Sequence, residues 1–321
     1  MSITTTDVIR EYGAYYIDAG QNKQRILKML TTPREITGYA TPFKSDDTIF
    51  RLANATFRSL VQPFQKTFTQ KGGVEIVPNE IRQYRFKIDD EFMPDELYAS
   101  WLGFLTAKNV DRKTWPFVQW LIEVYYNGQI DQDMELNEYY KGVYSAPAAG
   151  VAGLDGTGMD GLQKQLRNGV NAGTINSINI GELHKDTIFD QVEAFTDKIT
   201  EVYQGIQMNV FMSRAWYKKY MQDKRAQGFY FKTSDAQIDG GIDFTPLNVK
   251  PMSSMVGTND IFVTPQANFI WVTPATLTKN NFKLEEVKRS VAVMADWSEG
   301  LGFGINQAVW TNILPSGSGS I

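Results

Sequence analysis

The chain has 321 residues, a net charge of −4, no cysteine and a single histidine. The missing cysteines exclude disulfides, thiolate nucleophiles and zinc-ribbon sites, and any Ser-His-Asp triad would have to use His184. The acidic balance argues against a dedicated nucleic-acid-binding protein, although weak contact with DNA and a carboxylate-only metal site stay open. There is no run of about 18 apolar residues and no signal-peptide pattern, so we expect a cytosolic product without a membrane span.

The first 60 residues carry only short helical patterns, and Gly20, Pro33, Gly38 and Pro42 interrupt them repeatedly. This punctuation predicts an extended arm that leans on another element. A loop-rich edge of the same domain is the equal alternative.

Residues 64–92 alternate polar and apolar side chains, which is typical of strands. The Pro78-Asn79-Glu80 segment predicts the turn of a long hairpin. A two-stranded ribbon alone is only marginally stable, so we expect this hairpin to find its partner elsewhere, including on another chain.

An acidic segment follows, and its carboxylates could form a glycosidase pair or a metal site. The candidates are Asp89, Asp90, Asp95 and Glu96. The same residues suit a solvated turn and the start of a helix, where acids complement the helix dipole, and this interpretation is favoured.

The clearest long helix begins at Thr114, and Gly128 is expected to interrupt it before residues 131–140 continue the rod. Residues 145–173 are small and glycine-rich, which marks a boundary. They include a short amphipathic helix built on Leu162, Leu166 and Val170 and closed by Gly173.

A new module begins at His184, which is expected to be a surface or capping residue. Thr187 to Asp190 has the spacing of a capping box. The helix behind it has one apolar face, made of Ile188, Val192, Phe195, Ile199 and Val202. A strand over 206–212, a helix capped by Ser213 that runs through Arg225, and a short strand at 229–231 complete an α+β layer.

Residues 242–249, 260–264 and 268–273 also look like strands, broken by prolines that suit edges and turns. In the last strand Leu301, Phe303, Ile305, Gln307 and Val309 alternate with small residues.

Three of these small residues are Gly300, Gly302 and Gly304, which predict a face pressed against another backbone. They do not form a nucleotide loop, because the dinucleotide fingerprint needs a following helix and a different spacing.

This order of elements resembles that of tailed-phage major capsid proteins with the Hong Kong 97 fold. Three phrases support the resemblance: Gly156 to Leu162 after the long helix, Asn209 to Trp216 in the module after His184, and Asn259 to Phe269 before the last strands. The resemblance implies an α+β fold with an N-terminal arm (1–60), an E-loop hairpin (61–97), a peripheral domain with a spine helix (98–183), an axial domain (184–284) and closing strands with a C-terminal tail (285–321).

It also implies a structural protein without catalytic, cofactor or metal site. The subunit would assemble through hexamers and pentamers into an icosahedral virion shell, formed in the bacterial cytoplasm, that encloses double-stranded phage DNA with only weak contact. A portal and a separate scaffolding protein are the implied partners. The candidate inter-subunit contacts are the hairpin charges Glu75, Glu80, Arg82, Arg85 and Lys87.

Two alternatives remain open at this point. A nanocompartment shell of the encapsulin type would share the fold but enclose protein cargo. A carbohydrate-active hydrolase would use the acidic pair, with tryptophans as a sugar platform.

Overall fold

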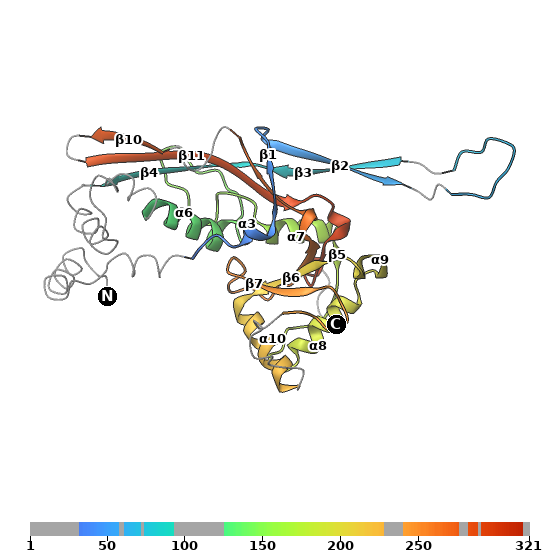
Figure 1. The fold of residues 1–321 in the computed structure, drawn as a ribbon. Helices are drawn as coiled ribbons and strands as arrows, with labels where there is room; N and C mark the ends of the chain where they lie inside the picture. The colour runs from blue at the N-terminus through green and yellow to red at the C-terminus, as the bar shows by residue number, and fades with distance from the viewer. Residues whose placement is uncertain are drawn as a thin grey trace, which may run out of the picture. The chain divides into compact units, whose positions relative to one another are not determined.

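A computed structural model provides the structure of the chain, and it describes residues 32–57, 61–71, 74–92, 125–227, 240–275, 282–287 and 290–316 (Figure 1). The chain divides into two compact units. The first contains residues 1–33, 88–132 and 282–295, and the second contains residues 34–87, 133–281 and 296–321. The structure mixes helices and strands, as expected from the sequence.

The helices within the described residues are short. They are α3 (Ile36–Tyr39), α6 (Asn127–Asp133), α7 (Leu162–Asn171), α8 (Ile188–Asp197), α9 (Glu201–Gln204) and α10 (Arg214–Ala226), with a π-helical turn at Met134–Glu138 and 3-10 turns at Gln266–Asn268 and Asn306–Ala308. The predicted amphipathic helix is confirmed as α7, since Leu162, Leu166 and Val170 are buried and Gly173 ends it with a φ of 71°. Glycine suits that left-handed position because it has no Cβ.

The strands that the structure describes form three sheets. They are β1 (Thr41–Lys44), β2 (Ile49–Phe57), β3 (Val74–Arg82), β4 (Tyr84–Phe92), β5 (Asn176–Ser177), β6 (Met208–Ser213), β7 (Asn248–Met252), β8 (Phe262–Pro265), β9 (Phe269–Thr273), β10 (Phe282–Val287), β11 (Ser290–Phe303) and β12 (Trp310–Thr311). One sheet has the order β1-β9-β11-β10 with β4 also paired to β11, the second has the order β5-β12-β8-β6-β7, and β2 pairs with β3. Pro251 lies on the edge strand β7, where a missing N–H is tolerated.

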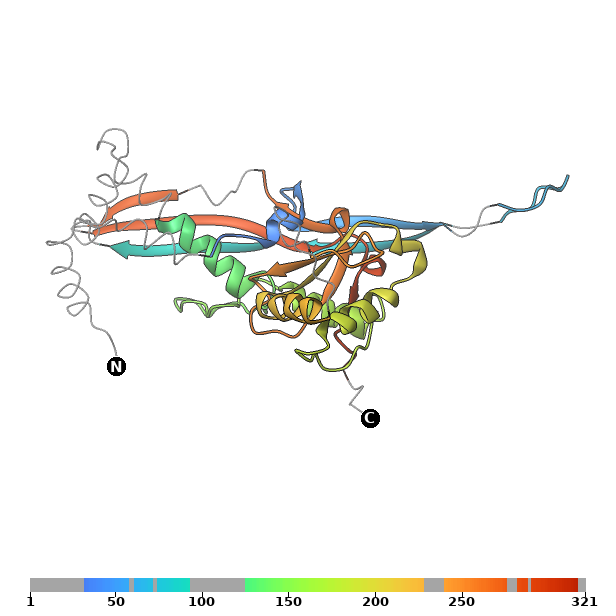
Figure 2. The same ribbon diagram turned by 60° about the horizontal axis from the view of Figure 1, so that its bottom comes forward.

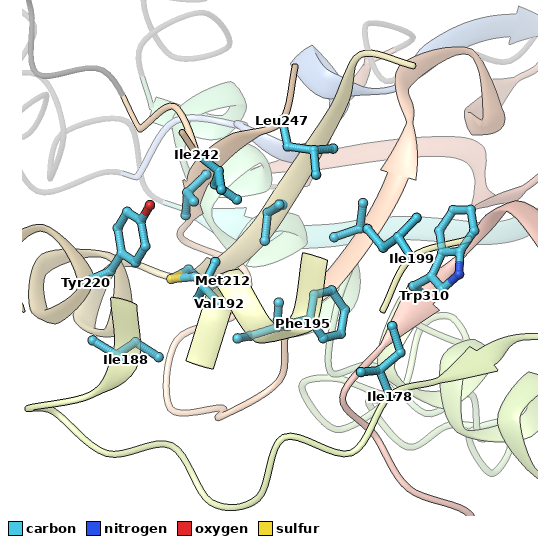
Figure 3. Close-up of a cluster of buried hydrophobic side chains, with 14 of the residues drawn as sticks. Ile178, Ile188, Val192, Phe195, Ile199, Met212, Tyr220, Ile242, Leu247 and Trp310 are labelled. Atoms are coloured by element: carbon cyan, nitrogen blue, oxygen red, sulfur yellow. The ribbon is translucent and has the colours of Figure 1, made fainter. Parts of the chain in front are cut away.

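The main core lies between the second sheet and helices α8 and α10 (Figure 3). Strand alternation divides β6: Val210 and Met212 face this core, whereas Phe211 packs against the rings of Phe262 and Phe269. Ile188, Val192 and Phe195 are buried, so the predicted apolar face is confirmed for these residues of α8, and Ile199, just beyond the helix, is buried as well.

The same face does not extend to Val202, which is 81% exposed. Helix α8 ends at Asp197, and Thr200 starts the separate helix α9, so the helical period is reset before Val202. The predicted capping box is also wrong. Thr187 makes no side-chain cap bond, and the carboxylate of Asp223 accepts the hydrogen bond of the Phe189 N–H instead.

Ser213 caps α10 as predicted, because its hydroxyl accepts the Trp216 N–H. We expect Ser213→Ala to lower the free energy of unfolding by about 1 kcal/mol, since the buried Trp216 N–H then has no acceptor. Urea denaturation measures this change. Thr187→Ala is the matched control at a position without a cap bond, and an equal loss there would contradict the role assigned to Ser213.

Three further expectations are wrong. The Pro78-Asn79-Glu80 segment is not a turn, because β3 runs through it and pairs with β2. Gly128 does not interrupt the helical segment, since it lies inside α6. The last strand stops at Phe303 and a 3-10 turn follows, so the strand alternation does not continue to Val309.

The start of the long helix, from Thr114 to Ile122, and the strand expected at 229–231 lie outside the described residues. In the part of the chain that the structure describes, we find no helix with the length and apolarity needed to cross a bilayer.

Candidate assembly interface

Strands β2 and β3 form a two-stranded antiparallel ribbon, and within the described residues neither is hydrogen-bonded to another strand (Figure 1). Nine residue pairs make up the ladder, from Ile49 opposite Arg82 to Phe57 opposite Val74. Such a ribbon leaves one edge of each strand without backbone partners, and two strands alone are only marginally stable in water. The ribbon therefore has two strand edges that no described strand pairs with.

The described part of the loop between these strands, residues 61–71, exposes large apolar side chains. Val61, Phe64 and Phe68 are 85%, 93% and 91% exposed. The loop's polar groups bond within it: the Gln62 amide donates to the Thr69 carbonyl at 2.8 Å, and the Lys71 ammonium donates to the Val61 carbonyl. Because these apolar side chains are exposed together, the loop offers an apolar contact surface.

The charged candidates divide between two strands. Glu75, Glu80 and Arg82 lie on β3 of the ribbon, whereas Arg85 and Lys87 lie on β4. The side chain of Glu75 lies outside the described side chains.

Glu80, Arg82 and Arg85 interact with residues of their own chain. Glu80 accepts from Arg51 across the ribbon at 2.9 Å, and Arg85 lies 3.7 Å from Asp296 on β11. Arg82 stacks on the rings of Tyr84 and Tyr144. Exposed pairs of this kind contribute little to stability, so they leave these groups available to a neighbour.

The root of the ribbon is held close against β11. A Cβ on Gly300 would lie 2.6 Å from the Arg82 carbonyl oxygen, and a Cβ on Gly302 would lie 3.0 Å from Ile81 Cγ1. Asn79 donates to the Phe303 carbonyl at 2.5 Å. The face of β11 that carries these glycines has no side chains there, so the backbone of the ribbon can approach it closely.

Gly304 continues the glycine-bearing face just after β11 ends. A Cβ there would lie 3.1 Å from Ile270 Cδ1 and 3.3 Å from Asn268 Oδ1. The buried Gln83, between β3 and β4, donates to the carbonyls of Ser45 and Asp47, each at 2.7 Å. The Gln83 hydrogen bonds hold the base of the ribbon, whereas the described loop residues 61–71 are exposed.

A buried polar cluster around Arg34 holds the segment that leads into α3 and β1. Arg34 donates to both carboxylate oxygens of Glu299, at 3.0 and 3.1 Å, and the hydroxyl of Tyr139 donates to the same carboxylate at 2.5 Å. Trp271 donates to it at 3.2 Å. Sequence reasoning missed this cluster, because 265 residues separate Arg34 from Glu299 and neither belongs to a motif.

The next two residues are held in the same way. The carboxylate of Glu135 accepts the N–H groups of Glu35 and Ile36, at 3.0 and 3.2 Å. Glu35 in turn pairs with Arg214 and accepts the Ser253 hydroxyl at 2.9 Å. Residues 34–36 are thus anchored to the body of the second unit, whereas an arm that leans only on other chains would need no such contacts.

Burial raises the pKa of Glu135 above its ordinary 4.5, and the N–H groups of Ile36 and Glu35 offset this only in part. The folded carboxyl thus holds its proton more tightly than the unfolded one, so this contribution to stability is lost as pH rises from about 4.5 through the folded pKa. We expect Glu135→Gln to reduce that loss in urea denaturation between pH 4.5 and 8. Some loss remains, because the pKa of Glu138 is raised too. An unchanged pH dependence would contradict the assignment.

Two of the four acidic candidates, Asp89 and Asp90, lie in the described residues. Asp89 and Asp90 lie in strand β4, so they do not form the predicted turn, and Asp90 accepts the Tyr126 hydroxyl at 2.7 Å. Asp95 and Glu96 lie outside the described residues. His184 is exposed, as expected. The described residues contain no group of three or more acidic, histidine or cysteine side chains placed to hold a metal.

No family model and no curated protein matches the sequence. Solved structures do match. The capsid of a native GTA particle aligns with a TM-score of 0.58 at 11% identity, over 89% of this chain and 92% of that chain. The satellite phage P4 procapsid, solved with its size determination protein, aligns with a TM-score of 0.57 at 12% identity, over 96% and 97%.

The chain has a phage-capsid fold. The holo-SrpI encapsulin complex of Synechococcus elongatus also aligns, with a TM-score of 0.50 at 10% identity, over 91% of this chain and 92% of that chain.

Proposed function

We propose that the protein is the major capsid subunit of a tailed phage, which assembles through hexamers and pentamers into an icosahedral shell around double-stranded DNA. The observation that carries the proposal is the self-paired β2–β3 ribbon with Phe64 and Phe68 exposed at its loop. An element of this kind gains stability only when a neighbouring copy buries it. The capsid fold supplies the class of assembly.

In this proposal the ribbon and its loop correspond to the E-loop, which begins at Ile49 rather than at residue 61. The second sheet with α8 and α10 corresponds to the axial domain, and β11 with its glycines to the closing strand. The charges Glu75, Glu80, Arg82, Arg85 and Lys87 set the register with the neighbour more than they supply binding energy.

The remaining partners follow from the same role. A portal and a separate scaffolding protein act in the host cytoplasm during assembly. DNA is held in the virion by enclosure, because the chain carries a net charge of −4 and binds the phosphate backbone only weakly.

The protein expressed alone and together with the scaffolding protein tests this proposal. We expect rings or closed shells in negative-stain images and in sedimentation velocity. Monomers alone at high concentration under both conditions would overturn it.

A nanocompartment shell is the second candidate, supported by the alignment with the encapsulin complex. The contents of purified particles separate the two proposals. Nuclease-protected DNA supports the phage capsid, whereas a co-purified protein cargo without DNA supports the nanocompartment.

A further inference from the structure

The two helices that cover the second sheet carry charges of opposite sign. They come forward side by side in Figure 2. The acidic residues of α8 are Asp190, Glu193 and Asp197, and the ten residues of this helix include no lysine or arginine. Their spacing of three and four places them on one side of the helix, opposite the buried Ile188, Val192 and Phe195. We call these three residues the acidic stripe.

Helix α10 is basic on its outer side. Lys218 and Arg225 are exposed and seven residues apart, which is two helical turns, and Lys219 lies over the ring of Trp216 at 3.7 Å. Trp216 and Tyr220 face the core from the opposite side of the helix. We call Lys218, Lys219 and Arg225 the basic stripe.

Other charges on these helices already serve the fold of the chain itself. Lys224 is buried and donates to the Gly241 carbonyl at 2.8 Å, and the buried Asp223 accepts the Phe189 N–H at 2.9 Å. Arg214 pairs with Glu35. Within the stripes, Asp190 accepts the Gln227 amide at 3.1 Å and Lys219 lies over Trp216, whereas Asp197, Lys218 and Arg225 are exposed.

A row of like charges on one helix is unfavourable by itself. Burial raises the pKa of Glu193, the carboxylates of Asp190, Asp243 and Asp197 raise it further, and Lys224 offsets this only in part. A cationic surface placed against the acidic stripe would relieve this repulsion, and the same protein carries such a surface on the adjacent helix. Each copy thus holds both halves of a complementary contact.

We propose that the acidic stripe of one copy binds the basic stripe of a second copy, in a contact between the α8–α10 layers that is separate from the β2–β3 ribbon. The inference rests on the proposed function, since it assigns a further contact in the same assembly. Charge complementarity of this kind sets the choice of partner and the association rate, and it weakens as salt rises.

The test uses two full-length variants with single-sign layers. One carries Asp190→Lys with Asp197→Lys, so that both stripes are basic, and the other carries Lys218→Glu with Arg225→Glu, so that both are acidic. We expect each variant alone to need at least about a tenfold higher protein concentration for assembly, and an equimolar mixture to recover the wild-type concentration. Sedimentation velocity measures assembly, and circular dichroism shows that each variant is folded.

The neutral variants Asp190→Asn with Asp197→Asn, and Lys218→Gln with Arg225→Gln, give the same test with less disturbance. Each should weaken the dependence of assembly on salt. If the wild type assembles and the single-sign variants assemble at the same protein concentration, this inference is overturned while the proposed function stands. Failure of the mixture, together with tighter DNA binding by the all-basic variant, would assign the basic stripe to DNA instead. A wild-type protein that never assembles would overturn the proposed function itself.

Discussion

Replacing Phe64 and Phe68 together by serine is expected to abolish shell formation while the single chain stays folded. Each ring is more than 90% exposed in the subunit, so its loss removes no contact within the described chain. Burying a phenylalanine at a contact contributes about 1.5–3 kcal/mol. Two rings therefore contribute about 3–6 kcal/mol per contact, or about two to four orders of magnitude in the association constant.

Negative-stain imaging and sedimentation velocity across a concentration series measure this effect, and circular dichroism follows the fold. Val202→Ser is the matched control, because Val202 is 81% exposed on α9, away from the ribbon. Wild-type particle yield from the double variant would contradict the role of the loop, whatever the behaviour of the control.

The largest effect on the stability of the chain is expected at Arg34. Arg34→Leu leaves the carboxylate of Glu299, whose side chain is 3% exposed, without the guanidinium that neutralises it. Removing one partner of a buried ion pair costs about 3–5 kcal/mol, because an uncompensated charge remains inside the protein. Urea denaturation measures the loss, and the Phe64→Ser, Phe68→Ser background keeps the chain monomeric during the measurement.

The structure offers a matched control for this change. Arg51 and Glu80 also form an ion pair at about the same distance, but their side chains are 70% and 51% exposed. Arg51→Leu should therefore change the free energy of unfolding by less than about 1 kcal/mol. Arg34→Leu together with Glu299→Leu should be milder than Arg34→Leu alone, and equal losses would exclude a buried-charge explanation.

Local sequence signals correctly predicted the two helices whose ends depend on residues close by in the sequence. Ser213 before an amphipathic run gave the start of α10, and the four-residue spacing of Leu162, Leu166 and Val170 gave α7. Val202 shows the limit of such periodicity, because a helix can end within one turn and restart with a different face. The order of elements and its resemblance to capsid proteins indicated the overall fold.

The hairpin shows why turn residues alone can mislead. Pro78, Asn79 and Glu80 are typical turn formers, yet a strand passes through them because each strand of a two-stranded ribbon has one unpaired edge that tolerates proline. The polar cluster around Glu299 gave no signal at all, since its members come together only through tertiary packing. Its buried charges could be recognised only from the structure.

The base of the ribbon is held by β11 and by the Gln83 hydrogen bonds, whereas its loop is exposed. This difference has a mechanical consequence. A strand of nine residues spans about 30 Å at about 3.3 Å per residue, so a bend of about 10° near Arg82 moves the far end by about 5 Å. A small bend where the ribbon meets the glycine-bearing face of β11 would therefore move Phe64 and Phe68 over a much larger distance. In the proposed assembly, subunits that meet at different angles would contact one another through the same rings, and their cores would keep the same packing.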